Sequence, residues 1–123
     1  MVAPAVFLIV CIGRMANHRF FTPEDIDGDP RRADTPKAIE LQRVLQNTVE
    51  QSVLATIVYA MWTMVAPVQS VGTVLIAAGL FAVGRVLFMA FHAKGASGRA
   101  IGFVLTFYPT CTLFIETLLI LLR

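Results

Sequence analysis

The chain alternates between long apolar segments and short polar connections, a pattern typical of a bundle of membrane-spanning helices. Apolar residues fill 2–13, the second half of 37–66, and most of 71–93 and 99–122. A helix rises about 1.5 Å per residue, so the last three segments are long enough to cross a hydrocarbon core of about 30 Å. The pattern therefore predicts an all-α integral membrane four-helix bundle, built as a single domain over residues 1–123.

The first apolar segment is shorter than the other three. Residues 2–13 would form a helix of only about 20 Å. A signal peptide is not favoured, because no positive residue precedes the segment and no small-residue cleavage site follows it. We therefore expect either an unusually short first helix or a true start that lies upstream of Met1.

The connections between these segments carry turn and capping signals. Residues 14–36 combine many charges with prolines and a glycine, which predicts a water-exposed loop, and Thr22-Pro23 marks one short helical turn within it. Thr35-Pro36 repeats this signal and predicts the start of the second helix. Residues 67–70 form a short uncharged connection, and the glycines of 94–98 predict a tight turn. Tyr108-Pro109 predicts a kink in the fourth helix.

Composition and charge support a membrane protein. Hydrophobic residues make up 57% of the chain and charged residues only 15%, against roughly 25% in soluble domains. The net charge of +2 and the absence of a basic patch argue against a nucleic-acid partner, and no cluster of residues has the spacing of a metal site. Basic residues concentrate in the loops 14–36 and 94–98 and at their edges, so the positive-inside tendency predicts that both loops are cytosolic. They are Arg14, Arg19, Arg31, Arg32, Lys37, Lys94 and Arg99.

Three polar side chains share one face at the start of the second helix. At about 100° per residue, Arg43, Asn47 and Glu50 lie within a narrow sector. Such groups are costly beside lipid unless they face each other, the bundle interior or a ligand, and they therefore form a candidate site. The alternative is that they lie in the hydrated headgroup region, or satisfy one another only to join helices.

Two further ionisable residues lie on the third helix, seven positions apart and hence on one face. Arg85 is about 12 Å below the 94–98 turn, at a depth comparable to that of Glu50, which predicts a Glu50–Arg85 ion pair. That pair would more simply join two helices than act in catalysis. His92 lies nearer the interface, where histidines are commonly hydrated, and Arg99 begins the fourth helix, from which it could reach lipid phosphates. Small residues along the third helix predict subunit packing: Gly72, Ala77, Ala78, Gly79, Ala82 and Gly84.

Together these residues resemble a family. The pattern Arg-x-x-x-Asn-x-x-Glu at residues 43–50, with Arg85 on the third helix and Arg99 at the head of the fourth, resembles the MAPEG proteins, membrane-associated proteins of eicosanoid and glutathione metabolism. The segment Phe20-Phe21-Thr22-Pro23-Glu24-Asp25 is similar to Phe-Ala-Asn-Pro-Glu-Asp in the microsomal glutathione transferase and prostaglandin E synthase branch. The resemblance covers nearly the whole chain.

The resemblance implies a homotrimer with glutathione bound between subunits near the cytosolic side. It implies that Arg43, Asn47 and Glu50 hold the charged ends of glutathione, that Arg85 and His92 belong to the same binding site, and that Arg14 and Arg99 come from a neighbour or the adjoining helix. Arg99 would be the catalytic residue facing the thiol, because a guanidinium favours the thiolate of a group whose ordinary pKa is about 8.5. A lipophilic electrophile would enter from the bilayer.

Some positions depart from the family pattern. His92 stands where a tyrosine is common, Phe88 and Phe103 stand where tyrosines often occur in catalytic members, and Gln46 replaces an arginine. By the resemblance, the loss of these hydroxyls would weaken both glutathione anchoring and catalysis, so an alternative stays open: a non-catalytic membrane protein of the family that binds a lipid or scaffolds a partner. A third hypothesis is a small transporter or channel subunit in which Glu50 and Arg85 line a polar path.

Overall fold

The computed structural model describes residues 2–26 and 33–123, and every regular element in these ranges is a helix. The all-α bundle expected from the sequence is therefore confirmed. The α-helices and the short 3₁₀ turns between them have these bounds: α1 (Val2–Phe21), α2 (Pro23–Ile26), α3 (Pro36–Val65), η1 (Val68–Ser70), α4 (Val71–Phe91), η2 (His92–Lys94) and α5 (Ala96–Leu121).

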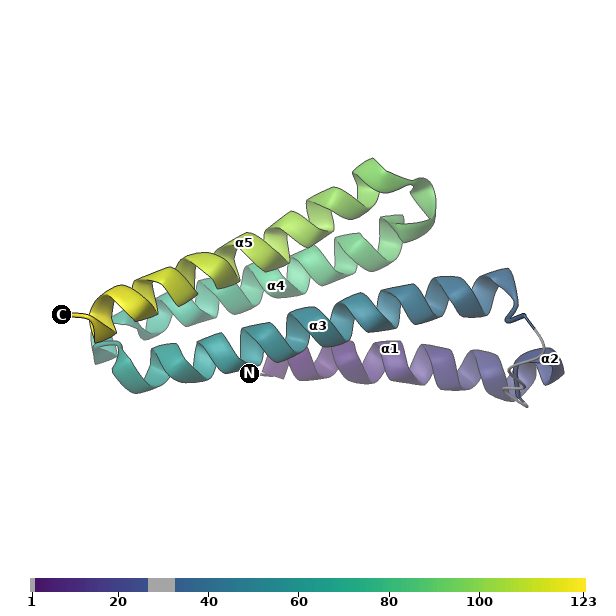
Figure 1. Cartoon of the computed structure of the whole chain (residues 1–123), viewed down its shortest axis with the longest axis horizontal. Helices are drawn as coiled ribbons and strands as arrows, with labels where there is room; N and C mark the ends of the chain where they lie inside the picture. Colours follow the sequence, from purple (N-terminus) through teal and green to yellow (C-terminus); the bar gives the residue numbers. More distant parts are fainter. Residues whose placement is uncertain (1, 27–32) are drawn as a thin grey trace.

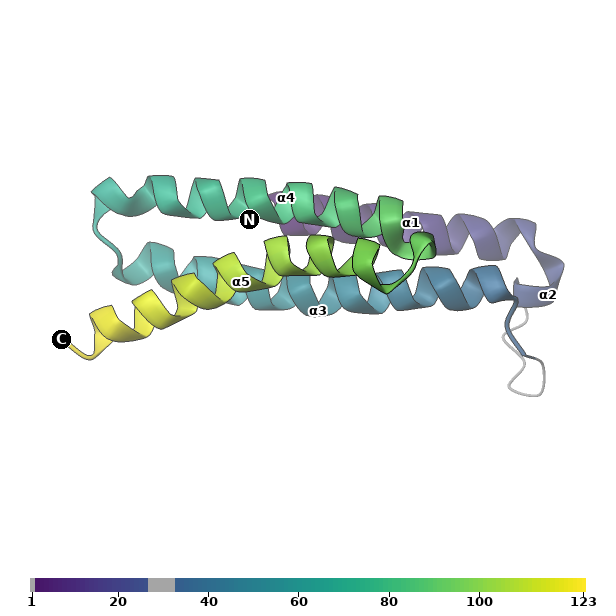
Figure 2. The ribbon, with the colours of Figure 1, turned by 90° about the horizontal axis from the view of Figure 1, so that it is seen from above.

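The four long helices form two antiparallel pairs. Helix α1 packs along α3, and α4 packs along α5, and these are the most extensive contacts between elements. Figures 1 and 2 show the two pairs lying side by side, with the end that carries α2 extending beyond the η2 turn. Figure 1 also shows that α1 accompanies only the N-terminal part of α3.

Helix α1 is longer than the sequence analysis predicted. It comprises 20 residues and continues through Arg14 to Phe21 instead of ending at Gly13, so its length is about 30 Å. The expectation of a short first helix, with a loop from residue 14, is therefore wrong. The helix continues because polarity alone does not end a helix, and no proline stands between Arg14 and Thr22.

The predicted caps and turns fit the structure well. Thr35 is the N-cap of α3, where its side chain accepts a hydrogen bond from the Ala38 N–H, and α2 is the single helical turn expected after Thr22. Gly95, with φ of 105°, precedes α5, in a region of backbone space that glycine adopts readily. Pro109 lies inside α5, and Figure 2 shows that this helix changes direction along its length.

Helices α4 and α5 make a close backbone contact through two glycines. A Cβ at Gly102 would lie 2.5 Å from the Phe88 backbone N and 2.7 Å from the Gly84 carbonyl O, while one at Gly84 would lie 2.8 Å from the Gly102 carbonyl O. No other residue type has room at either position. The glycines therefore fix how α4 and α5 pack, directly beside Arg85.

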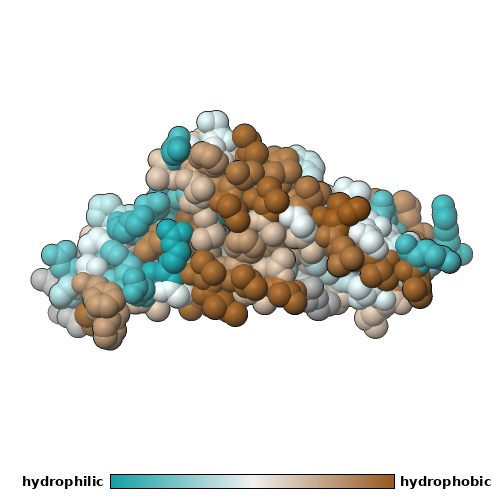
Figure 3. All heavy atoms as spheres, turned by 180° about the vertical axis from the view of Figure 1, so that it is seen from behind, coloured by the Kyte–Doolittle hydropathy of each residue, from teal (hydrophilic) through white to brown (hydrophobic). Residues whose placement is uncertain are grey.

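Two of the described helical segments are long and apolar enough to cross a membrane, Val68–Lys94 and Ala96–Leu121. Figure 3 shows one face of the molecule, on which a broad apolar surface separates a hydrophilic end, where α2 lies, from the hydrophilic C-terminal tip. The apolar interior has two parts. The larger, around Tyr59, Trp62 and Phe81, lies away from α2, and the smaller surrounds Cys11, Val44 and Phe88.

Candidate functional site

A fully buried arginine lies at the junction of the two helix pairs. Arg85, on α4, has no exposed side-chain surface and donates from Nη1 to the Asn47 Oδ1 at 2.9 Å. Nη1 also lies 3.4 Å from Thr48 Oγ1, and Nη2 lies 3.4 Å from Thr106 Oγ1. The guanidinium carbon lies 4.5 Å from the centre of the Phe88 ring, at a distance that permits a cation–π contact.

The hydroxyls around Arg85 are oriented to accept. Thr48 donates its own proton to the Val44 carbonyl at 2.8 Å, and Thr106 donates to the Phe103 carbonyl at 2.9 Å. Each oxygen thereby turns lone pairs toward the guanidinium. The Nε atom of Arg85 has no partner among the described residues. Neutral oxygens therefore solvate the cation, and within residues 2–26 and 33–123 no carboxylate forms an ion pair with it.

The predicted Glu50–Arg85 pair is wrong. Glu50 is exposed on α3 and accepts a hydrogen bond from the Gln46 side chain at 2.9 Å, while Arg85 is inside the bundle and bonds to Asn47. The prediction matched Glu50 and Arg85 by their depth along the helices. Glu50, however, lies on the outer side of α3, whereas Arg85 approaches α3 from inside the bundle. Their separation also removes the continuous polar path that the transporter hypothesis required.

Asn47 lies at the border between the interior and an exposed polar face of α3. Its Oδ1 is held by Arg85, and its Nδ2 group donates to none of the described residues, which leaves amide protons available. Arg43, Gln46 and Glu50 are exposed beside it. Arg43, Asn47 and Glu50 thus lie on one side of α3, as the helical spacing predicts. Of the three, only Asn47 is held by a hydrogen bond from the interior, which Arg85 donates.

His92 and Arg99 lie at the same end of the bundle as Arg43. His92 is buried, contacts the Phe88 ring with 5.2 Å between ring centroids, and its Nδ1 has no described partner. Arg99 is half-buried in the first turn of α5. Three cations, Arg99, Arg43 and Lys37, act electrostatically on the His92 ring, against one carboxylate, Glu40. The immediate surroundings of His92 therefore carry more positive than negative charge, which suits an anionic ligand.

Arg14 contributes a further cation to this end. It is exposed on α1 and lines a hollow of about 220 Å³ between α1 and α3. The other lining residues are Asn17, His18, Lys37 and Leu41. Arg14 therefore lies with the basic residues of this end, although no described hydrogen bond joins it to Arg43 or Arg99.

A second polar cluster ties α1, α2 and α3 together. The carboxylate of Asp25 accepts from the Thr35 N–H at 3.0 Å and from the Thr35 hydroxyl at 2.7 Å, and His18 Nε2 lies 2.9 Å from Asp25 Oδ2. The hydrogen bonds from Thr35, and after them the contact with His18, lower the pKa of Asp25 below its ordinary value of 3.8. Asp25 therefore fixes the end of α1 to the start of α3 as a carboxylate.

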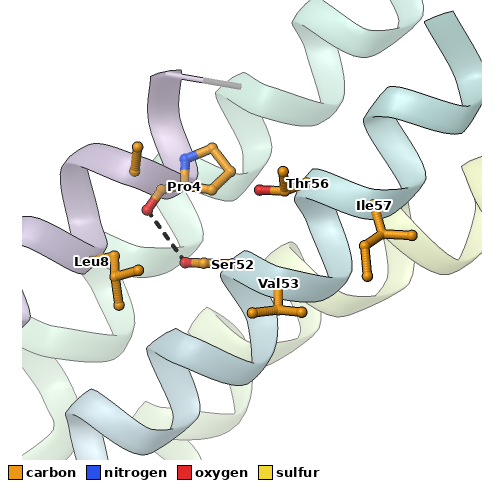
Figure 4. Close-up of a pocket in the computed structure, with 7 residues that line it drawn as sticks. Pro4, Leu8, Ser52, Val53, Thr56 and Ile57 are labelled. Atoms are coloured by element: carbon orange, nitrogen blue, oxygen red, sulfur yellow. Dashed lines mark hydrogen bonds between the residues drawn. The ribbon is translucent and has the colours of Figure 1, made fainter.

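An apolar groove continues the polar face of α3. It has a volume of about 430 Å³ and lies between α1 and α3, lined by Pro4, Ala5, Leu8, Ser52, Val53, Thr56 and Ile57. Figure 4 shows these side chains around the groove, with the Ser52 hydroxyl donating to the Pro4 carbonyl at 3.3 Å. Val53 and Ile57 follow Glu50 at helical spacings of three and seven residues, so they lie on the same face.

Sequence reasoning missed the partners of Arg85 in the interior. Thr48 and Thr106 are both buried, and Cys11 Sγ lies 3.5 Å from Thr48 Oγ1. A signal for Thr106 was present, because α5 repeats small or hydroxyl residues on its buried face, at Gly102, Thr106, Thr110 and Thr117. Such a face in an apolar helix indicates close packing and internal hydrogen bonding.

The positions that depart from the expected tyrosines are occupied by packed phenyl rings. Phe88 is 5% exposed and lies against both Arg85 and His92. Phe103 stacks on Phe107 with ring centroids 5.1 Å apart. Both rings therefore serve the packing of this end of the bundle, and neither supplies a hydroxyl to a ligand.

Comparison with known families accounts for the pattern. The family model of MAPEG matches residues 1–119, while no curated protein and no solved structure gives a significant match. The match covers nearly the whole chain and agrees with the helical bundle and its two apolar membrane-length helices. The branch within the family stays a prediction. The chain belongs to the MAPEG family of membrane proteins of eicosanoid and glutathione metabolism.

Proposed function

We propose that the protein is a membrane-bound glutathione-dependent transferase that acts on lipophilic electrophiles. The observation that carries this proposal is the fixed position of Asn47, which the buried Arg85 holds between the exposed Arg43 and Glu50. A preorganised amide between a cation and a carboxylate suits a ligand with carboxylates and an ammonium. Glutathione carries these groups.

Each proposed contact follows from charge. Arg43 would bind a carboxylate of glutathione, Glu50 its ammonium, and the free Nδ2 group of Asn47 a carbonyl or carboxylate oxygen. Arg14, Arg99 and His92 would line the same site from the adjoining helices or from a neighbouring subunit. Arg85 would act through Asn47, since its own side chain has no exposed surface.

A homotrimer completes this proposal. The hydrogen-bonded Gln46 and Glu50 side chains are exposed near the middle of α3, and such polar groups are costly beside lipid. A neighbouring subunit that covers this face would remove the cost. Three copies are what the family resemblance implies, with the site near the cytosolic side, where the connection between α1 and α3 and the 94–98 turn would lie.

The proposed chemistry depends on Arg99. A guanidinium next to the glutathione sulfur favours the thiolate, which is the nucleophile. The thiolate would form a bond to an electrophilic carbon, and the leaving group would depart with the electron pair of the broken bond. The apolar groove of Figure 4, which continues the Arg43–Glu50 face, would hold the lipophilic part of the electrophile.

A thermal-shift titration of the detergent-purified protein with glutathione tests the binding site. Saturable stabilisation that Arg43→Ala abolishes and Gln42→Ala preserves would support the proposal, because Gln42 is an exposed neighbour on the same helix. The oxidised form and an S-alkyl analogue of glutathione show which end of the ligand is recognised. The absence of any shift at millimolar glutathione would overturn the proposal.

An alternative function is favoured by one observation. Phe88 and Phe103 are packed and provide no hydroxyl, which suits a non-catalytic member that binds lipid or scaffolds a partner. The two functions differ in one readout. An enzyme forms a thioether from glutathione and a lipophilic aryl halide faster than the solution reaction, whereas a scaffold leaves that rate unchanged.

A further inference from the structure

A hollow of about 260 Å³ opens on the exposed side of the α4–α5 pair, next to the turn that joins the two helices. It is lined by Leu87, Phe91, Ser97, Gly98 and Ile101. The turn separates the two membrane-length helical segments, Val68–Lys94 and Ala96–Leu121, so it lies at a membrane surface. Figure 1 shows it at the end of the α4–α5 pair. The hollow thus extends from this surface into the apolar layer.

The hollow is apolar at its deep end and polar at its mouth. Helix α4 runs toward the turn, so Leu87 lies one helical turn deeper than Phe91. Helix α5 runs away from the turn, so Ile101 lies about one turn deeper than Ser97. Two aliphatic side chains therefore form the deep end, and a hydroxyl stands at the mouth. An amphiphile would enter with its chain directed toward Leu87 and Ile101.

A cation is held at the mouth of this hollow. The Lys94 Nζ lies 4.9 Å from the centre of the Phe91 ring, at a distance that permits a cation–π contact, and Phe91 lines the hollow. Lys94 forms no salt bridge within residues 2–26 and 33–123. The first N–H groups of α5 follow Gly95, which supplies no side-chain cap, and add further donors beside Ser97. The mouth therefore offers donors and positive charge to an anion.

The helices that form the hollow carry no carboxylate near its mouth. No Asp or Glu occurs between Glu50 and Glu116 in the chain. Glu40 of α3 acts electrostatically on His92, which begins the turn, but Glu40 is itself paired with Lys37 at 3.0 Å. A headgroup with a net negative charge would therefore meet cations here. The ammonium of a zwitterionic headgroup would find no counter-charge in the α4–α5 pair.

We propose that this hollow binds an anionic phospholipid, with its phosphate at Lys94 and Ser97 and one acyl chain directed toward Leu87 and Ile101. In a phospholipid the phosphate stands between the acyl chains and the outer part of the headgroup, so the order of groups along the lipid matches the order of residues along the hollow. Lys94 pairs with the phosphate, and the Ser97 hydroxyl donates to it. The site uses none of the residues assigned to glutathione and does not depend on that function.

Native mass spectrometry of the full chain in its own oligomeric state tests the proposal. The protein is offered an equimolar mixture of phosphatidylglycerol and phosphatidylcholine with the same acyl chains. The wild type should retain phosphatidylglycerol with about a fivefold preference, the factor expected for one basic residue at a membrane surface. Lys94→Gln should abolish the preference, and Lys94→Arg should keep it. Arg19→Gln, which removes an exposed cation from α1, is the charge-matched control and should keep the wild-type preference.

A second pair of variants tests the place of the acyl chain. Ile101→Trp fills the deep end and should weaken retention of phosphatidylglycerol, whereas Ile115→Trp, at an exposed position of α5 outside the hollow, should not. Soluble glycerophosphoglycerol, which has the headgroup without the chains, should not displace the lipid. All these positions are exposed, and unchanged helix content by circular dichroism would verify the fold.

Four results would overturn the proposal. Equal retention of the two lipids by the wild type would mean that the hollow has no charge preference or is covered by a neighbouring subunit. A wild-type preference in Lys94→Gln, or the same loss in Arg19→Gln, would remove the role of Lys94. Unchanged retention in Ile101→Trp would place the chain elsewhere, and displacement by glycerophosphoglycerol would make the site one for a soluble phosphate.

Discussion

The Nη1 atom of Arg85 donates a hydrogen bond of 2.9 Å to Oδ1 of Asn47, and so connects the buried interior of the bundle to the polar face of α3. The guanidinium has no exposed surface, whereas Asn47 is half-buried next to the exposed Arg43 and Glu50. Arg85 is therefore a positioning residue in the proposed site, and its effect on a ligand passes through the Asn47 amide.

Arg85→Met separates positioning from stability. Methionine fills most of the same volume but cannot hold Asn47, so we expect glutathione affinity to fall about tenfold, equivalent to about 1.4 kcal/mol. The melting temperature should stay the same or rise, because an apolar residue often replaces a buried charge without loss. Thermal-shift titration measures both quantities. Thr106→Val, which removes a different Arg85 acceptor, is the control and should leave affinity nearly unchanged. An Arg85→Met protein with normal affinity would show that Asn47 needs no partner.

Arg99→Ala tests the thiolate. A guanidinium that lowers a thiol pKa of about 8.5 by one to two units raises the thiolate fraction about 8- to 25-fold at pH 7, so turnover should fall by about that factor. The ultraviolet absorbance of the bound thiolate, followed against pH, should shift to higher pH in the variant. Arg19→Ala, an exposed arginine on α1, is the matched control. Parent-level turnover in Arg99→Ala would refute the role of Arg99.

Gly102→Ala tests the close contact between α4 and α5. The added methyl group would lie 2.5 Å from the Phe88 backbone N, and this backbone cannot move without shifting the helix. We expect a loss of about 1–3 kcal/mol or more in stability, with the melting temperature as the measurement. Gly79→Ala provides the contrast, because nothing lies within 4 Å of its added methyl group and alanine favours a helix by up to about 1 kcal/mol. Equal effects of the two substitutions would mean that the contact is not tight in solution.

The hydrogen bonds to the Asp25 carboxylate make the stability of the α1–α3 junction dependent on pH in the acid range. The pKa of Asp25 is lowered in the folded protein, so the contribution of its carboxylate to stability is fully present above the ordinary value of 3.8. The contribution declines as pH falls from that value and is lost once pH passes below the lowered pKa. The protection of the Thr35 and Ala38 amides against hydrogen exchange, measured relative to the intrinsic exchange rate at each pH, should therefore fall in this acid range. Asp25→Asn should accelerate exchange at neutral pH, whereas Glu24→Gln, exposed beside it, should not. Equal protection in Asp25→Asn would show that the carboxylate is dispensable.

The sequence predicted most of the helices because their boundaries carry local signals. Thr35 caps α3, Pro67 follows its end, and Gly95 precedes α5 in a conformation that glycine favours. The end of α1 was missed because the boundary was placed where hydrophobicity falls, whereas the helix continues to Phe21. Hydropathy reports the surroundings of a segment and does not by itself report where its backbone hydrogen bonds stop.

The candidate site was predictable as a set of residues but not as a set of contacts. The helical spacing correctly placed Arg43, Asn47 and Glu50 on one face. It did not tell which part of that face turns inward, and so Glu50 rather than Asn47 was expected to meet Arg85. Depth along a helix follows from counting residues, but the rotation of a helix toward its neighbour depends on packing at positions distant in the sequence.

The two glycines have a consequence for motion. Because Gly84 and Gly102 bring the backbones of α4 and α5 into contact, these two helices cannot move closer together without a backbone clash. Helices α1 and α3, joined through Asp25 and Thr35, form the other pair. The Arg85–Asn47 hydrogen bond crosses the boundary between them. A ligand that pulls on Asn47 therefore acts at the contact between the two helix pairs.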